Sequence, residues 1–295
     1  MRRWIKISLW TLLLAGGVVL CAVRWQVWFG MPPEPKWTGD TIDYVFPHPE
    51  SENNPTILIL GDIHNRLTRS DYDSLAARVP QATVIAQTGD WMNRGQEYYR
   101  QLLLREWTNS ELYGLPVIAC PGNHEYSKGI GKTLSPVWQE TFGEESNYYV
   151  DFPNMRFIII DTNPLTRTVR LTRALTWLRN AMYTAGDRYI VVMMHHPVLA
   201  PAKGRFNPLI YATFRHALGE ADLVLAGHDH SYMRRSPFVV LNTGGELKPQ
   251  HLGFAAEKTD TVPVYGVLTV NDGLEFRVFR LEDGEIIDSL YVKHD

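Results

Sequence analysis

The feature of this 295-residue chain that most constrains its fold is a set of five polar motifs, each placed directly after a short apolar run. In chain order they are GDIH (61–64), GDWMNRG (89–95), GNHE (122–125), MMHHP (193–197) and GHDH (227–230). Short apolar runs of this kind are typical of strands that are buried on both faces. Because ligands of open α/β sheets bind beyond the carboxyl ends of the strands, we expect the five motifs to meet at one edge.

Strand-like and helix-like segments alternate over most of the chain. Predicted strands cover 56–60, 83–87, 116–120, 148–152, 156–160, 189–194 and 223–226, and predicted helices cover 71–79, 96–112, 171–182 and 209–217. After GHDH only strands are expected, at 238–241, 264–270, 275–280 and 286–292. The pattern predicts an α/β fold in which two sheets pack face to face with helices outside.

Residues 1–30 are predicted to be an uncleaved membrane anchor formed by one transmembrane helix. Basic residues precede an uncharged run at 7–23, and tryptophans flank that run as they do at membrane interfaces. A cleaved signal peptide and a buried helix are the alternatives. The basic flank should stay in the cytoplasm, which would place the rest of the chain on the extracytoplasmic side. Residues 31–54 form a Pro-rich linker, and 55–295 form one domain.

The charge of the chain argues against a nucleic-acid partner. Four of the 29 basic residues and none of the 32 acidic residues lie in the first 30, so the remainder carries a net charge of −7. Contact with a phosphate backbone needs clustered Lys and Arg. No disulfide is predicted, because Cys21 lies in the expected anchor and Cys120 lies in the body.

The polar motifs supply the side chains that divalent metal ions bind. The seven candidate ligands are Asp62, His64, Asp90, Asn123, His195, His228 and His230. Mixed oxygen and nitrogen shells of this kind suit Mn, Zn or Fe. Two such ions about 3.5–4 Å apart can clamp the attacking and leaving oxygens of a displacement, and they need a bridging carboxylate. Asp90 is the best bridge, and a water or hydroxide between the ions would be the nucleophile.

The order of these motifs resembles that of the calcineurin-like metallophosphoesterases, over about residues 56–235. The segments YYVDFPNMRFIIIDT, HDHSYMR and NTGG are similar to the purple-acid-phosphatase-like branch of that family. The resemblance implies a four-layer αββα sandwich of two mixed β-sheets flanked by helices. It implies one metal ion held by Asp62, His64, Asp90 and His230, and a second held by Asp90, Asn123, His195 and His228. It also implies that His124 contacts the leaving oxygen and protonates it.

The chain departs from purple acid phosphatases at two positions. Asn93 stands where those enzymes have a tyrosine ligand, and His64 is present where they lack a histidine. We therefore expect a colourless site without a tyrosinate. The motif GDWMNRG is also similar to the GDxxDRG of protein serine/threonine phosphatases, in which the arginine binds the phosphoryl group. That similarity makes Arg94 a candidate for substrate contact.

Further candidates lie beside the expected ligands. Tyr232 and Arg234 follow GHDH closely enough to contact a substrate, and Glu125 could start a helix or support a ligand. His196 should point away from His195 if the backbone is extended there. Asp161 should hold a loop through hydrogen bonds. The segments 201–207 and 246–258 are candidate rims of the substrate site.

The predicted function is a metal-dependent phosphoric ester hydrolase, acting on a monoester or a diester. Its substrate would be a small phosphoester, nucleotide or lipid-linked molecule. Two alternatives stay open. The first is a metal-stabilised binding or scaffold module that kept the fold without catalysis. The second is cleavage of a pyrophosphate or nucleotide-sugar bond by the same residues.

Overall fold

A computed structural model describes residues 53–126, 133–143, 146–163, 168–198, 208–248 and 256–294. The predicted anchor at 1–30 lies outside the described residues, as do nearly all of the linker at 31–54 and the predicted rim segment at 201–207. Among the helices that the structure describes, none combines the length and the apolar character needed to cross a membrane.

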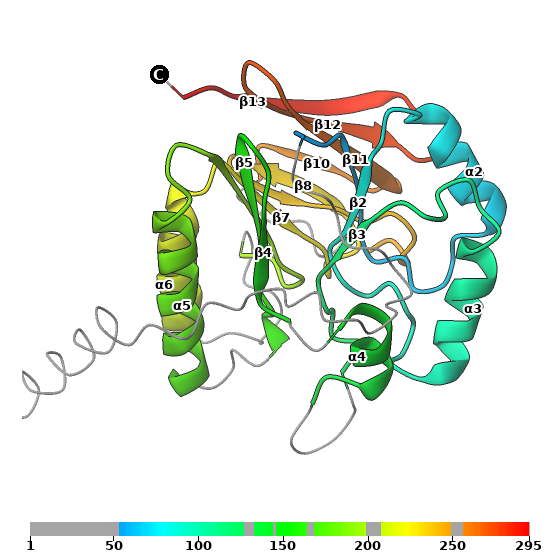
Figure 1. The fold of residues 1–295 in the computed structure, drawn as a ribbon, viewed down its shortest axis with the longest axis horizontal. Helices are drawn as coiled ribbons and strands as arrows, with labels where there is room; N and C mark the ends of the chain where they lie inside the picture. The colour runs from blue at the N-terminus through cyan, green and yellow to red at the C-terminus, as the bar shows by residue number, and fades with distance from the viewer. Residues whose placement is uncertain are drawn as a thin grey trace, which may run out of the picture.

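The first of two mixed β-sheets has the strand order β13-β12-β11-β1-β2-β3 (Figure 1). Its strands are β1 (Ile57–Leu60), β2 (Val84–Gln87), β3 (Val117–Ala119), β11 (Val264–Val270), β12 (Leu274–Arg280) and β13 (Ile286–Val292). Strands β1, β2 and β3 are parallel, whereas β11 pairs with β1 in the antiparallel sense and continues into β12 and β13. The three parallel strands are buried along their whole length, as their continuous apolar runs predict.

The second sheet has the strand order β10-β8-β9-β7-β6-β5-β4. Its strands are β4 (Tyr148–Asp151), β5 (Met155–Ile159), β6 (Tyr189–Met193), β7 (Leu223–Ala226), β8 (Tyr232–Arg235), β9 (Phe238–Val240) and β10 (Lys258–Asp260). Strands β5, β6, β7 and β9 are parallel, and the antiparallel strands β4 and β8 flank them. The carboxyl ends of β6 and β7 therefore lie at one edge of this sheet, as those of β1, β2 and β3 do in the first.

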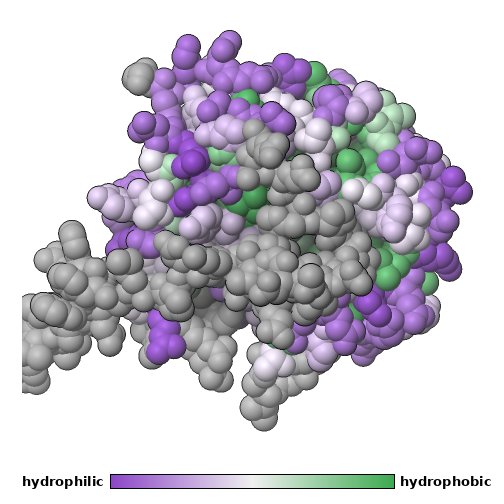
Figure 2. Space-filling model, viewed as in Figure 1, coloured by the Kyte–Doolittle hydropathy of each residue, from purple (hydrophilic) through white to green (hydrophobic). Residues whose placement is uncertain are grey.

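Helices cover the outer face of each sheet. Figure 1 shows α5 (Thr168–Tyr183) and α6 (Pro208–Ala217) beside the second sheet, with α2 (Arg69–Arg78), α3 (Glu97–Trp107) and α4 (Pro136–Phe142) beside the first. One apolar core fills the space between the sheets. A second core lies between the second sheet and its helices, and a third lies between the first sheet and its helices. The outer surface on the side of α2 and α3 is mainly hydrophilic (Figure 2). The prediction of two mixed sheets flanked by helices is confirmed.

The structure shortens one predicted helix and adds three elements and a 3₁₀ turn. The helix expected at 96–112 ends at Trp107, because the side chains of Thr108 and Asn109 donate hydrogen bonds back to helix carbonyls at 2.7 and 2.8 Å. Helix α4, strands β8 and β10 and the 3₁₀ helix η2 (Leu218–Glu220) were not predicted. Helix α4 has a recognisable start, in which Ser135 caps the helix and Pro136 occupies its first turn.

Candidate metal centre

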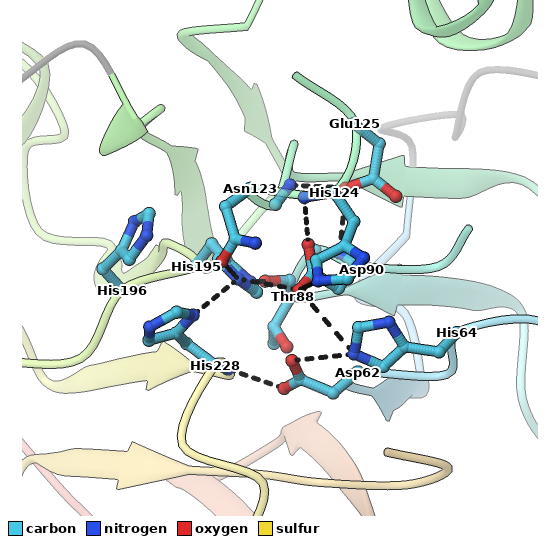
Figure 3. Close-up of polar contacts among 12 residues, drawn as sticks. Asp62, His64, Thr88, Asp90, Asn123, His124, Glu125, His195, His196 and His228 are labelled. Carbon is cyan, nitrogen blue, oxygen red and sulfur yellow. Dashed lines mark hydrogen bonds and ion pairs between the residues drawn. The ribbon is translucent and has the colours of Figure 1, made fainter. Parts of the chain in front are cut away.

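The five polar motifs lie in the loops that directly follow β1, β2, β3, β6 and β7. These loops come together where the carboxyl ends of both sheets' parallel strands meet, as Figure 3 shows for ten labelled residues. The position is the one expected for a ligand site in an open α/β sheet. All seven predicted metal ligands are brought into this cluster.

The first part of the cluster consists of Asp62, His64, Asp90 and His230, which are all buried. One potential ligand atom from each lies within 4.8 Å of those from the others. The Nε2 atoms of His64 and His230 face each other at 3.1 Å, and Asp62 Oδ1 lies 3.9 and 3.6 Å from them. Two carboxylates and two imidazoles thus surround one small volume.

The second part of the cluster is richer in nitrogen. His195 Nε2 lies 3.2 Å from His228 Nδ1 and 3.3 Å from the side-chain oxygen of Asn123. His196 also has a ring nitrogen within 4.8 Å of those of His195 and His228. This group therefore offers imidazole and amide donors rather than carboxylates of its own.

Asp90 lies between the two groups. Its Oδ2 atom is 3.3 Å from His195 Nε2 and 3.7 Å from His64 Nε2. One carboxylate oxygen is thus close to a potential ligand atom of each group, which is the arrangement that a bridging carboxylate needs.

The hydrogen bonds of the histidines leave their inward nitrogens free for a cation. His195 Nδ1 donates to the carbonyl of Thr88 at 3.0 Å, and His230 Nδ1 donates to the carbonyl of Glu246 at 2.7 Å. A carbonyl oxygen can only accept, so each Nδ1 carries a hydrogen and Nε2 is the ring atom that faces the cluster, where it can bind a cation once it has released any proton of its own. The buried Asp62 Oδ1 has no hydrogen-bond partner among the residues that the structure describes. These residues fit one or more metal ions.

The protonation equilibria show that the cluster attracts positive charge. Burial opposes ionisation of Asp90, but the neighbouring histidines, with His195 first, lower its pKa well below the usual range. Burial likewise opposes protonation of His195, yet the charges of Asp90 and Asp62 raise its pKa to about 9. A bound cation would satisfy the same negative potential and take the place of that proton.

His64 and His230 have the opposite tendency. Burial is the largest cause in both cases, and it lowers the pKa of His64 to about 3 and that of His230 to about 4. Both rings are therefore neutral at pH 7, as metal ligation requires. The charge of Lys248 adds to the lowering at His230.

The backbone is held in an unfavourable conformation at most of these ligands. Six described residues other than glycine have a positive φ, and five of them are predicted ligands: Asp62, His64, Asp90, His228 and His230, with φ between 48° and 71°. The sixth is Asn65, with φ 57°. Positive φ is uncommon outside glycine and costs roughly 1–2 kcal/mol per residue. Clustering of this strain at one place is characteristic of a functional site.

Two glycines allow the loops to approach the carboxylates. A Cβ atom on Gly122 would lie 2.1 Å from Asp90 Oδ1, and one on Gly227 would lie 2.4 Å from Asp62 Oδ2. Both distances are too short for any side chain. Glycine at these positions is therefore required by the packing of the loops against the ligands.

Glu125 supports the cluster from behind. It is fully buried, and its carboxylate accepts the main-chain N–H groups of Asp90, Met92 and Gly122 at 3.0, 3.0 and 2.8 Å. One side chain thus ties the loop after β2 to the loop after β3. Burial raises the pKa of Glu125 to about 8, an effect increased by Asp90 and opposed by the N–H groups.

His124 lies at the accessible side of the cluster. Its main-chain N–H donates to Asp90 Oδ1 at 2.8 Å, and its Nε2 lies 3.9 Å from Asp90 Oδ2. The side chain is 37% exposed, so a substrate can reach the ring. Arg94, in the neighbouring loop, is also exposed.

His196 does not follow the expected alternation. Strand β6 ends at Met193, and the chain bends at His195 and His196. The His196 ring packs 4.5 Å from the His228 ring, and its Nδ1 is 2.8 Å from the hydroxyl of Thr162. His196 therefore stays beside the cluster instead of on the opposite face.

Tyr232 and Arg234 do not join the cluster. Tyr232 is fully buried between the sheets, and its hydroxyl donates to Asp288 of β13 at 2.6 Å. Arg234 forms ion pairs with Asp288 and Glu257, each at 2.7 Å. Their closeness to GHDH in the sequence is misleading, because β8 carries both side chains into structural contacts.

Some supporting residues were anticipated and others were not. Asp161 accepts the N–H of Asn163 at 2.9 Å and the hydroxyl of Tyr126, so it holds a loop as expected. In the NTGG segment, Thr243 exchanges hydrogen bonds of 2.9 and 2.7 Å with the main chain of Gly61. Two contacts had no signal in the sequence, because they depend on which loops meet. The side-chain oxygen of Asn65 accepts the main-chain N–H of Asn93, and the carbonyl of Thr88 accepts a hydrogen bond from His195.

Comparison with known proteins agrees with this geometry. The model of the calcineurin-like phosphoesterase family matches residues 55–232. A glycerophosphodiester phosphodiesterase, GpdQ, of Enterobacter lignolyticus is 24% identical in an alignment of 162 residues that covers 52% of this chain and 56% of the relative. The chain thus spans little more than half the length of that relative.

Solved structures share the fold at low identity. The purple acid phosphatase PPD1 of yellow lupin has a TM-score of 0.66 and 14% identity, covering 85% of this chain and 55% of that one. GAP50, the anchor in the inner membrane complex of Plasmodium, has a TM-score of 0.62 and 16% identity, covering 83% of this chain and 90% of that one. These similarities establish the arrangement of two sheets and helices.

Proposed function

This chain belongs to the calcineurin-like phosphoesterase family, and on that basis we propose that it hydrolyses a phosphoric ester with two metal ions as cofactors. The observation that carries the proposal is the position of Asp90, whose Oδ2 lies 3.3 Å from His195 Nε2 and 3.7 Å from His64 Nε2. A carboxylate shared by two groups of ligands supports a pair of ions rather than one.

The proposed ligands follow from the two groups. One ion would be held by Asp62, His64, Asp90 and His230, and the other by Asp90, Asn123, His195 and His228. The mixed oxygen and nitrogen donors suit Mn, Zn or Fe. No tyrosine belongs to either set, which supports a colourless protein.

The bound ions would supply an activated water and charge stabilisation for the phosphoryl oxygens. The residues of the chain do the remaining work. Asp90 and Glu125 fix the loops, and His124 presents its Nε2 on the accessible side of Asp90. From there His124 can give a proton to the departing oxygen, a contribution that is typically worth about 10²–10⁴ in rate.

We propose a small phosphoester as the substrate and suggest that diesters be tested beside monoesters. The printed name of the bacterial relative, a glycerophosphodiester phosphodiesterase, supports trying a diester. The exposed Arg94 beside His124 could bind a doubly charged monoester through its guanidinium. Monoesters and diesters of different size and charge are therefore the substrates to compare.

We also propose that residues 1–30 anchor the enzyme, with its body on the extracytoplasmic side of a membrane. The support is the uncharged run at 7–23, its basic start and its aromatic flanks. Fusing a reporter that is active on only one side of the membrane to the carboxyl end tests this topology.

The activity is tested on purified protein stripped of metal and then given Mn, Zn or Fe separately. Hydrolysis of p-nitrophenyl phosphate is compared with that of bis-p-nitrophenyl phosphate, and Asp90→Asn, which lacks the shared carboxylate, is the control. Faster diester turnover identifies a phosphodiesterase, and the reverse identifies a phosphatase. The complete set of donors favours either outcome over a scaffold without catalysis, which would leave every phosphoester intact with metals bound.

A further inference from the structure

We propose that Asn65 is a positioning residue for His124 and that it acts through the main chain of Asn93. This inference rests on the proposed hydrolase function, in which His124 protonates the leaving oxygen. It links three loops, since Asn65 follows β1, Asn93 follows β2 and His124 follows β3.

Asn65 makes two hydrogen bonds to the loop after β2 and a third to the start of α3. Its main-chain N–H donates to the carbonyl of Trp91 at 3.0 Å, and its side-chain oxygen accepts the N–H of Asn93 at 2.8 Å. Its side-chain nitrogen donates to the carbonyl of Tyr99, in the first turn of α3, at 2.8 Å. The side chain thus uses both of its ends to hold this loop against the start of the helix.

Asn93 passes this constraint to His124. The carbonyl oxygen of Asn93 lies 2.5 Å from His124 Nδ1. The oxygen can only accept, so Nδ1 carries a hydrogen and Nε2 is the ring atom left to face the substrate. Because the N–H and the carbonyl of Asn93 flank the same Cα atom, a bond that fixes the first also restricts the second.

Asn93 itself lies in a loop. It is exposed and lies between β2 and α3, in a segment without helix or strand. The neighbouring Gly95 donates its N–H to the carbonyl of His124 at 2.7 Å, so this loop and the His124 loop are already adjacent. Asn65 is the side chain that fixes where the Asn93 carbonyl stands.

The backbone conformation of Asn65 agrees with a positioning role. Its φ of 57° is in the left-handed region, which asparagine tolerates better than most residues. That conformation turns the side chain toward the loop after β2. Replacing Asn65 by alanine would remove both side-chain hydrogen bonds and introduce a residue that is less suited to a positive φ.

Leaving groups of different basicity separate positioning of His124 from general damage. A p-nitrophenolate leaves without a proton, whereas an alkoxide needs one. The probes are p-nitrophenyl phosphate with ethyl phosphate, or bis-p-nitrophenyl phosphate with glycerophosphoethanolamine, according to which pair the wild-type protein hydrolyses. Loss of His124 should lower kcat/KM by about 10²–10⁴ on the alkyl ester and much less on the aryl ester.

The experiment compares Asn65→Ala, His124→Ala and the double variant, with bound metal measured in each. Asn65→Ala should lower kcat/KM about 10-fold or more on the alkyl ester, a part of the His124 contribution, and only a few-fold on the aryl ester. It should have little further effect in the His124→Ala background, because residues that act as a unit are not additive. Asn65→Asp keeps the acceptor for the Asn93 N–H and should recover most of the loss. Asn109→Ala, on an exposed turn, is the matched control.

Two results overturn the proposal. One is an equal loss on both esters, and the other is a full additional loss in the His124→Ala background; either would show that Asn65 acts on folding or metal binding instead. A wild-type protein that cleaves none of the probes with any metal would overturn the proposed function and this inference with it. If the wild-type protein is active and Asn65→Ala loses equal activity on the alkyl and the aryl ester, only the positioning role is overturned.

Discussion

The carboxylate of Glu125 accepts the main-chain N–H of Asp90 at 3.0 Å, so a fully buried acid holds the residue that lies between the two groups of metal ligands. The same carboxylate binds the N–H groups of Met92 and Gly122. Removing it would leave three main-chain donors buried without partners.

Replacing Glu125 by glutamine should lower the free energy of unfolding by about 1–3 kcal/mol, because a buried donor left without an acceptor costs roughly that much. The amide keeps the volume of the side chain but presents an NH₂ group to at least one N–H. Urea unfolding of the metal-free protein measures the change. Glu97→Gln, on exposed helix α3, is the control and should stay within about 0.5 kcal/mol. An unchanged stability for Glu125→Gln would contradict this role.

Gly122→Ala should abolish most activity and reduce bound metal, because the new Cβ would meet Asp90 Oδ1 at 2.1 Å. Displacing the bridging candidate affects both groups of ligands, so we expect a loss of about 100-fold or more, as 1 Å displacements at active sites can cause. Gly219→Ala is the matched control, since a Cβ there meets nothing within 4 Å. Equal activity of the two variants would show that the loops can move apart at no cost.

Raising the pH from 7 to 9 should destabilise the metal-free protein. The pKa of His195 is raised to about 9 and that of Glu125 to about 8, so the folded state holds protons in this range that the unfolded state has released. Stability from a raised pKa is complete below the unfolded value and is lost as the pH passes the folded one. At roughly 1.4 kcal/mol per proton and pH unit, we expect a fall of about 1–3 kcal/mol.

Urea unfolding at pH 7, 8 and 9 measures this fall. With saturating metal the fall should shrink, because metal ions replace the proton of His195 and bind more tightly as the ligands deprotonate, whereas Glu125 is not a ligand and keeps its own contribution. His195→Asn should also flatten the dependence of the metal-free protein. A stability that rises with pH in the absence of metal would contradict the assignment of these protons.

Tyr232→Phe should change stability but not catalysis. The Tyr232 hydroxyl binds Asp288 in the other sheet and is far from solvent, so its removal should lower the free energy of unfolding by about 1 kcal/mol and leave kcat/KM within about two-fold.

Arg94→Ala, in the exposed loop that contacts His124, should instead raise KM for a monoester while leaving stability nearly unchanged. A reversal of these two effects would return Tyr232 to the substrate site.

The positions of the metal ligands could be predicted because each depends on local sequence and one rule of topology. Asp62 and Asp90 come directly after buried strands, and parallel strands of one sheet end at the same edge. The resemblance to a family added the pairing of ligands into two sets. Neither step required knowledge of how any two loops contact each other.

The failed or absent predictions depend on such contacts or on where regular backbone stops. His196 was placed by assuming extended backbone, but β6 ends at Met193, three residues earlier. Tyr232 was placed by its distance in sequence from His230, whereas its direction is set by β8, which turns it into the core between the sheets. Asn65 carries no pattern of its own, and its role follows only from the meeting of three loops.

Metal content and activity of one sample test the central claim, two ions bridged by Asp90, most directly. The purified protein is loaded with Mn, Zn or Fe, its bound ions are counted, and phosphoester hydrolysis is measured before and after a chelator. The account predicts two ions per chain, loss of hydrolysis on chelation and its recovery when metal returns. In Asp90→Asn both the binding of two ions and the hydrolysis should be lost. Full hydrolysis after every ion has been removed, or unchanged metal binding in Asp90→Asn, would contradict it.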